Sequence, residues 1–219
     1  MLIIVNVSAF GLAAAITPFV GRIAGHHGAA NIQSNSVQPP SRLGGLAVTV
    51  AFLIPLGTAL GLGVPGVELS GLQLSSLCIT TLAVVALGLY DDIHNASALE
   101  KLGIQVLLGI ATWAIGVRIE GVGALREYVP LSDAGSLCAT VLWIVAVINA
   151  INLIDGLDGL AAGIGLIAVS TLFSFGWVDG HVLLCLATAT LAGALTGFLV
   201  HNLAPARIFL GDSGSHLLG

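Results

Sequence analysis

Residues Asn149 to Gly163 read NAINLIDGLDGLAAG, and they lie between two long apolar runs, Leu137–Ile148 and Ile164–Phe175. An acidic side chain at the centre of a membrane helix costs roughly 2.5–3.5 kcal/mol. Asp155 and Asp158 therefore indicate that a cation, a polar substrate or water lies nearby. The alternative is a solvated turn whose aspartates cap the following helix.

The polar residues of this stretch recur at every third position, and they are Asn149, Asn152, Asp155 and Asp158. If the stretch is helical, these side chains share one slowly drifting face. Gly156 has no side chain, so a ligand or another backbone can approach it closely.

The composition of the chain predicts an integral membrane protein. It has 219 residues, of which 57% are hydrophobic and only 8% are charged, and its mean hydropathy is +1.06, whereas soluble domains carry about 25% charged residues. The net charge of −5 is spread thinly without a basic patch, which argues against a nucleic-acid partner. The first apolar run, Leu2–Val20, has its basic residue, Arg22, behind it, which favours an uncleaved helix over a secretory signal.

The apolar runs predict helices that cross the membrane. A helix needs about 20 apolar residues to cross a hydrocarbon core of roughly 30 Å, and alternation of period two is absent. We therefore predict an all-α, polytopic membrane protein with a single domain, residues 1–219, about seven transmembrane helices and the start of an eighth. The predicted spans are Leu2–Val20, Leu46–Leu62, Leu72–Tyr90, Leu102–Val117, Leu137–Asn152, Leu160–Trp177 and Val182–Val200.

Basic residues predict which loops face the cytoplasm. The loops after the odd-numbered spans contain Arg22, Arg42, Lys101 and Arg207, and the opposite loops contain Arg118 and Arg126. The positive-inside rule places the first set in the cytoplasm. Three acidic clusters lie in the same set of loops, so we expect one polar site at the cytoplasmic face.

The second acidic cluster, Gly88–Asp92 (GLYDD), ends the third span with adjacent carboxylates, Asp91 and Asp92. Adjacent carboxylates repel, so keeping both ionised at a membrane edge calls for a cation or a hydrogen-bonding partner. A solvated helix end is the alternative. Lys101, where the fourth span begins, can contact a phosphate or extend to the lipid headgroups.

The third cluster lies in His201–Ser215 (HNLAPARIFLGDSGS). Phe209 can stack on a base or occupy the membrane interface, and Asp212 can cap the predicted eighth helix or bind a metal beside backbone N–H groups. Carboxylates and asparagines without a Cys or His cluster suit Mg²⁺ or Mn²⁺ better than Zn²⁺, and no Walker or dinucleotide-binding glycine pattern is present. The residues thus indicate a metal-dependent site for a phosphorylated substrate at the membrane surface.

Four motifs in chain order resemble those of the polyprenyl-phosphate N-acetylhexosamine-1-phosphate transferases, a superfamily within glycosyltransferase family 4. The chain is most similar to the undecaprenyl-phosphate N-acetylglucosaminyl 1-phosphate transferases among them. The spacing Ser97-x-x-x-Lys101-x-x-x-Gln105 is also similar. The motifs are Pro40–Gly45 (PSRLGG), the Gly-x-x-Asp-Asp that ends at Asp92, the N-x-x-N-x-x-D-G-x-D-G-L of Asn149–Leu160 and the N-x-x-P-A-x-x-F-x-G-D-x-G-S of Asn202–Ser215.

The resemblance implies Mg²⁺-dependent transfer of a sugar-1-phosphate from a UDP-sugar to undecaprenyl phosphate, with release of UMP. This would be the first lipid-linked step of a cell-envelope polysaccharide. It implies a bacterial cytoplasmic membrane with the active site on the cytoplasmic side, and it leaves Mn²⁺ and a homodimer open. A simple N-acetylhexosamine, with N-acetylglucosamine first, is favoured over a muramoyl-peptide substrate because Pro40–Gly45 resembles the corresponding segment of the N-acetylhexosamine enzymes.

The resemblance also implies roles for single residues. Asp91 would act on the lipid phosphate as base or orienting group, Asp92 would support it, and Lys101 would contact phosphate. Asp155 would complete the catalytic set and, with Asn152, shape its polar cavity. The remaining residues would be Asp212 at the metal, Asn202 lining the metal site, Asp158 at the uracil edge, Phe209 stacked on the uracil, and Arg42 and Gly156 at the substrate.

Two features depart from the family pattern. Gly25–Gly28 (GHHG) and small polar residues stand where the first cytoplasmic loop usually carries extra basic residues. Family members are longer, so we expect a C-terminally truncated chain that is weakly active or inactive as it stands. A polytopic transporter and an inactive membrane scaffold are the alternatives. A transporter should carry acids near mid-span, and the second, fourth, sixth and seventh predicted spans have none within them.

Overall fold

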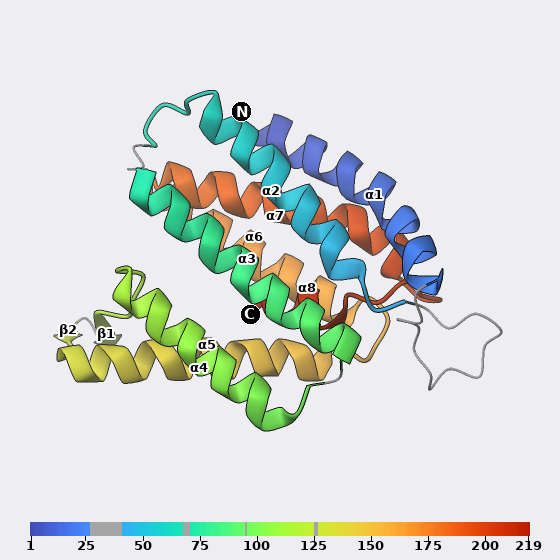
Figure 1. Cartoon of the computed structure of the whole chain (residues 1–219). Coiled ribbons are helices and arrows are strands. Elements are labelled where there is room, and N and C mark those ends of the chain that lie inside the picture. The colour runs from blue at the N-terminus through green and yellow to red at the C-terminus, as the bar shows by residue number, and fades with distance from the viewer. Residues whose placement is uncertain (27–40, 68–70, 95, 125–126) are drawn as a thin grey trace.

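The computed structural model describes residues 1–26, 41–67, 71–94, 96–124 and 127–219 (Figure 1). The helices are α1 (Leu2–His26), α2 (Gly44–Gly61), α3 (Gly71–His94), α4 (Ala98–Ala114), α5 (Asp133–Ile154), α6 (Leu160–Asp179), α7 (Val182–Asn202) and α8 (Gly211–Leu218). Two short strands, β1 (Gly121–Ala124) and β2 (Glu127–Pro130), lie between α4 and α5. The prediction of an all-α membrane protein is confirmed, and each predicted span corresponds to one helix.

Five helices of the described chain are long and apolar enough to cross a membrane: α1, α2, α5, α6 and α7. Helix α5, for example, has 22 residues and is about 33 Å long. Helix α4 has 17 residues, or about 26 Å, which is slightly short of a hydrocarbon core of roughly 30 Å. The crossings by α3 and α4 therefore stay predictions, while the chain as a whole is a multi-pass membrane protein.

Two local expectations were wrong. Helix α1 continues to His26, beyond the predicted span Leu2–Val20. Residues 27–40, which include the second half of GHHG, lie outside the described residues. The absence of period-two alternation predicted no strands, yet β1 and β2 pair antiparallel, with Val122 opposite Val129. Strands of four residues are too short to produce a periodic signal.

Helix α7 is the centre of the bundle and packs against α1, α2 and α6. Phe198, Leu195 and Ala194 on α7 are fully buried. Two glycines let α1 approach closely, because a Cβ at Gly193 or Gly197 would overlap a backbone carbonyl of α1. Small residues at helix contacts are what tight association in lipid requires, because apolar surface is already solvated by the acyl chains.

The short helix α8 is enclosed by α2, α3 and α5, and Ser213 and Ser215 on it are fully buried. Its backbone touches two other helices without intervening side chains. A Cβ at Gly45 of α2 would overlap the backbone of Gly214, and a Cβ at Gly88 of α3 would overlap the carbonyl oxygen of Asp212. These glycines allow the start of α8 to sit inside the bundle.

The segment before α8 is attached to the segment before α2 through backbone hydrogen bonds. The Phe209 N–H donates to the Ser41 carbonyl at 2.8 Å, and the Gly44 and Gly45 N–H groups donate to the carbonyls of Phe209 (3.0 Å) and Leu210 (2.6 Å). The first and fourth sequence motifs are therefore neighbours, and the free N–H groups at the start of α2 are satisfied by them.

The close approach at Gly88 gives a direct test of the packing. Gly88→Ala should lower the free energy of unfolding by about 1–3 kcal/mol, because the added methyl group forces α3 and α8 apart. The measurement is thermal or denaturant unfolding in detergent micelles. Gly103→Ala on α4 is the matched control, since nothing lies within 4 Å of its Cβ position and alanine is the better helix former. Equal stability of the two variants would show that α8 does not pack there.

Candidate active site

The stretch Asn149–Gly163 contains a helix end rather than one continuous helix. Helix α5 ends at Ile154 and α6 begins at Leu160, after Gly159 with φ +73°. Asn149 and Asn152 therefore lie on α5, whereas Asp155 and Asp158 lie in the turn. Of the four polar residues predicted to share a helical face, only the two asparagines lie on a helix.

The two aspartates of this turn do not cap α6, whose N-cap is Gly159 without any side-chain hydrogen bond. Asp155 accepts a hydrogen bond from the Gly211 N–H at 2.8 Å, and Asp158 accepts one from the Ala206 N–H at 2.9 Å. Both carboxylates thus hold the segment that leads into α8, and the capping alternative is wrong.

The amino terminus of α8 is bound by carboxylates from two distant parts of the chain. Asp92 on α3 accepts hydrogen bonds from the N–H groups of Asp212 (2.8 Å) and Ser213 (3.0 Å), and Asp155 takes that of Gly211. The first N–H groups of a helix have no partner within the helix, and the helix dipole favours negative charge there. Asp92 and Asp155 therefore fix the position of Asp212.

Asp212 itself turns its carboxylate toward α4 and α5. Its Oδ1 accepts a hydrogen bond from Asn152 Nδ2 at 2.7 Å, and its Oδ2 lies 3.4 Å from Lys101 Nζ. The N-cap of α8 is Leu210, without a side-chain bond, so Asp212 is not a capping residue.

Lys101 lies between two carboxylates. Its ammonium group forms a close ion pair with Asp91 and the longer one with Asp212. Asp91 is almost completely buried, and its Oδ1 also accepts a hydrogen bond from the Ala96 N–H at 2.9 Å. Lys101 is thereby held in place from both sides. Its position is explained by the ion pairs rather than by extension to the headgroups.

The structure thus brings six of the predicted residues together: Asp91, Asp92, Lys101, Asn152, Asp155 and Asp212. We call the four aspartates of this group the carboxylate cluster. Arg42 lies near enough to Asp155 to lower the pKa of its carboxyl. A Cβ at Gly156 would meet nothing within 4 Å, so a ligand can reach this backbone.

Three predicted residues belong to a neighbouring region around the loop between α7 and α8. Asn202 is buried, donates to the Ile208 carbonyl at 2.9 Å and accepts from the Gly159 N–H at 3.1 Å. Asp158 binds the Ala206 N–H of the same loop, and Phe209 is half-buried at its end. Among the described residues, Asn202 and Asp158 form hydrogen bonds with this loop and with Gly159 rather than with the carboxylate cluster. Their roles at a substrate stay predictions.

Sequence reasoning assigned no role to a second polar network. Asn149 donates to Gln105 Oε1 at 2.7 Å, and Gln105 Nε2 lies 3.2 Å from His216 Nε2. Gln105 and His216 are almost fully buried. The available signal was spacing, because each follows a site residue, Lys101 or Asp212, by four positions on a helix.

The donor set fits Mg²⁺ held by one or two carboxylates and not a metal cage built from protein alone. No group of three or more metal-ligating side chains converges suitably within the described residues. Mg²⁺ usually takes one or two protein carboxylates together with substrate phosphates, and the partly exposed Asp212 carboxylate provides one. Even with Asp155 protonated, Asp91, Asp92 and Asp212 exceed the nearby positive charges of Lys101 and Arg42, so a further cation is electrostatically favourable.

Burial raises the pKa of Asp155 to about 7. The Gly211 N–H lowers the pKa of this carboxyl, the charges of Asp212 and Asp92 raise it, and Arg42 lowers it. The folded protein therefore holds a proton that the unfolded chain releases near pH 4. The stability that this proton contributes is complete below that pH and is lost as the pH rises through about 7.

Asp155→Asn should remove this pH dependence while keeping an oxygen acceptor for the Gly211 N–H. We expect Tm in detergent to fall less between about pH 5 and pH 8 in this variant than in the unmodified chain. Asp179→Asn, at the far end of α6, should retain the full fall. A fall of the same size in Asp155→Asn would show that Asp155 is ionised throughout.

This geometry can be compared with proteins of known family. Residues 74–219 match glycosyl transferase family 4. The chain is 36% identical over 211 residues to a Bacillus subtilis (strain 168) protein named probable undecaprenyl-phosphate N-acetylglucosaminyl 1-phosphate transferase, a match that covers 93% of this chain and 56% of that protein. It is 38% identical over 209 residues to a Mycolicibacterium smegmatis protein named decaprenyl-phosphate N-acetylglucosaminephosphotransferase, covering 84% of this chain and 48% of that protein.

A further relative matches a smaller part. A Moorella thermoacetica protein named phospho-N-acetylmuramoyl-pentapeptide-transferase is 40% identical over 148 residues, which cover 61% of this chain and 46% of that protein. The chain spans about half the length of the curated relatives that it matches. The family match covers most of the chain, including most of α3 and every helix after it. The chain belongs to glycosyl transferase family 4, as its sequence motifs predicted.

Proposed function

We propose that the whole protein transfers N-acetylglucosamine-1-phosphate from its UDP-sugar to undecaprenyl phosphate, releases UMP and requires Mg²⁺. The observation that carries this proposal is the placement of Lys101 between Asp91 and Asp212 where predicted membrane spans end. Two phosphate compounds must meet in this reaction, and their charges have to be neutralised where water-soluble donor and lipid acceptor come together.

The named relatives support the choice of substrates. The two that match over the larger part of this chain are named as N-acetylglucosamine-1-phosphate or N-acetylglucosamine phosphate transferases acting on polyprenyl phosphates. The relative named for a muramoyl-pentapeptide matches over a smaller part. This difference favours the simple N-acetylhexosamine.

Each residue of the site would have its own role in the reaction. An oxygen of undecaprenyl phosphate attacks the sugar-bearing phosphorus of the donor, and the bond from that phosphorus to the bridging oxygen breaks, so that UMP leaves. Asp91 would orient the acceptor phosphate or take its proton, and Lys101 would neutralise charge on the transferred phosphate. We favour direct attack, without an aspartyl intermediate.

Asp212 would hold Mg²⁺, which when bound neutralises charge on the donor diphosphate. Asn152 binds one oxygen of Asp212 and so orients its carboxylate. Asp92 and Asp155 would act by fixing the start of α8. Asp158 and Phe209, with Gly156, Asn202 and Arg42, would form the nucleotide and sugar side of the site.

A transporter is less compatible with the structure. Every acidic residue of the described chain lies at a helix end or in a connection, as with Asp133 at the start of α5 and Asp179 at the end of α6. Ion pathways need ionisable groups near the bilayer centre.

Asp212→Asn tests the proposal. We expect it to lower formation of lipid-linked N-acetylglucosamine diphosphate by about 10²-fold or more, because a charged ligand is lost from the transition state. The assay supplies UDP-N-acetylglucosamine, undecaprenyl phosphate and Mg²⁺ and measures the lipid product and UMP. It is run on this chain and on a fusion to the second half of the Bacillus subtilis relative.

Asp179→Asn, at the opposite end of the bundle, is the matched control and should turn over like the unmodified protein. Equal turnover by Asp212→Asn and Asp179→Asn would contradict the metal assignment. No UMP release from the fusion, with Asp212 intact, would contradict the proposed reaction.

A further inference from the structure

The β1–β2 hairpin has little support from the rest of the chain. Its base is attached, because the Ile119 N–H donates to Thr140 Oγ1 at 2.9 Å and the Leu131 N–H donates to the Glu120 carbonyl at 2.9 Å. Beyond this base, neither strand makes an extensive contact with a helix among the described residues. A lone two-stranded hairpin is marginally stable in water, so its surroundings must contribute to its stability.

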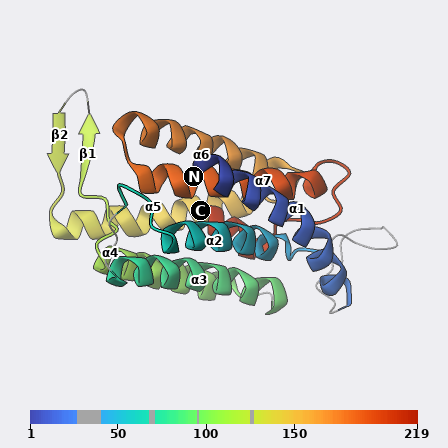
Figure 2. The same ribbon diagram turned by 90° about the horizontal axis from the view of Figure 1, so that it is seen from above.

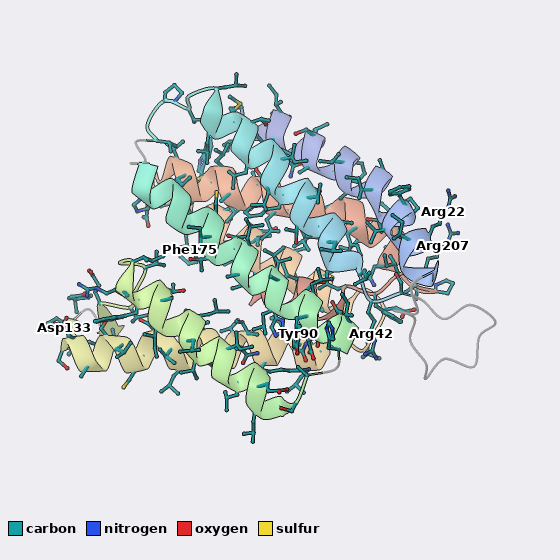
Figure 3. All side chains as sticks on the ribbon, viewed as in Figure 1. Arg22, Arg42, Tyr90, Asp133, Phe175 and Arg207 are labelled. Atoms are coloured by element: carbon teal, nitrogen blue, oxygen red, sulfur yellow. The ribbon has the colours of Figure 1, made fainter. Side chains whose placement is uncertain are left out.

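The hairpin lies at the end of the bundle opposite the carboxylate cluster. Helix α4 leads to it from Lys101, and α5 leads from it back to Asn152. Figure 3 shows Asp133, the first residue of α5, at one end of the bundle, and Tyr90 and Arg42 at the other. The 22 residues of α5 cover about 33 Å, which matches a bilayer. The hairpin is therefore at the opposite membrane surface.

The hairpin also has the orientation of a structure lying on a membrane. In Figure 2 the strands run crosswise to the helices, at the end where α4 finishes and α5 starts. Helices that cross the bilayer point along its normal, so strands perpendicular to them lie in the plane of the membrane.

Exposed apolar side chains lie on both faces of the hairpin. Val122 and Val129 form a cross-strand pair on one face and are 53% and 55% exposed. Tyr128 is on the other face, 64% exposed, and its ring covers Gly121, where a Cβ would overlap it. Tyrosine is enriched at membrane interfaces because its ring is apolar and its hydroxyl is polar.

The charges at the base of the hairpin are mixed rather than of one sign. The Arg118 guanidinium lies 5.5 Å from the ring centre of Trp113, and it pairs with Glu120 at 3.6 Å and Asp133 at 3.9 Å. Such a base gives no strong attraction to an anionic surface. Val122, Tyr128 and Val129 offer exposed apolar contacts, and the Glu120 and Asp133 carboxylates at the base are exposed as well.

We propose that the hairpin lies flat in the lipid interface of the leaflet opposite the carboxylate cluster, with the face that carries Val122 and Val129 in contact with lipid. The bilayer is the partner because the hairpin leads directly into α5, a helix long and apolar enough to cross a membrane, and lies in the membrane plane. It thereby sets the depth of α4 and α5, the helices that carry Lys101 and Asn152. This inference does not depend on the proposed function.

Spin labels on single cysteines test the proposal in phosphatidylcholine vesicles. Cys78, Cys138 and Cys185 are first replaced by alanine, and labels are then placed by Val122→Cys and Val129→Cys. The matched control is Asp179→Cys, an exposed position at the same end of the bundle. We expect the two hairpin labels to collide more with oxygen, which concentrates in lipid, and less with a water-soluble nickel chelate than the control label.

Equal nickel accessibility at the hairpin and the control positions would overturn the proposal. Protection that disappears as the protein is diluted into more lipid would instead identify a second copy as the partner, and protection that requires anionic lipid would identify an electrostatic contact. Either result also overturns it. Protection that persists on dilution and in zwitterionic lipid supports burial in the interface.

Discussion

The structure depends on the binding of the first N–H groups of α8 by Asp92 and Asp155. These two carboxylates come from α3 and from the turn after α5. A helix that starts inside a bundle leaves N–H groups that water cannot satisfy, and each unsatisfied group costs about 1–3 kcal/mol. The two carboxyl groups remove that cost by accepting the hydrogen bonds, and the helix dipole in turn stabilises charge on Asp92. Folding and assembly of the site are therefore the same event.

The position of every other residue of the site follows from this constraint. With the start of α8 fixed, Asp212 meets Asn152 from α5 and Lys101 from α4, and Lys101 reaches Asp91. The carboxylate cluster then has more negative charge than its neighbouring cations balance. Such a surplus suits the binding of a divalent ion and phosphates. Gly45 and Gly88 allow this arrangement, because a side chain at either position would overlap the backbone of α8.

Sequence patterns predicted most of this fold because long apolar runs, and the polar residues that separate them, are strong signals in a membrane protein. Apolar runs identified each long helix, and the basic residues Arg22, Arg42 and Arg207 do lie at one end of the bundle (Figure 3). The convergence of Asp91, Asp155 and Asp212 was expected from loops that share a side. The predicted spans Leu137–Asn152 and Leu160–Trp177 also placed the break between α5 and α6, whereas the three-residue repeat alone does not distinguish a helix from a helix followed by a turn.

Tertiary contacts explain the remaining differences. The roles of Asp92 and Asp155 in holding backbone N–H groups depend on the burial of α8, which its eight residues do not reveal. The Asn149–Gln105–His216 network joins three helices, so no single segment contains its signal. The hairpin is too short for periodicity. Local sequence thus predicted which residues are polar at the membrane edge, and the packing of α8 decided what each one binds.

Hydrogen–deuterium exchange of residues 210–218 in lipid nanodiscs tests the central constraint most directly. In the unmodified chain we predict slow exchange at the N–H groups of Asp212 and Ser213. In Asp92→Ala these groups should exchange faster, while α7 keeps its protection and serves as the internal reference. Exchange at α8 that is unchanged by Asp92→Ala would contradict the claim that this carboxylate holds the helix in place.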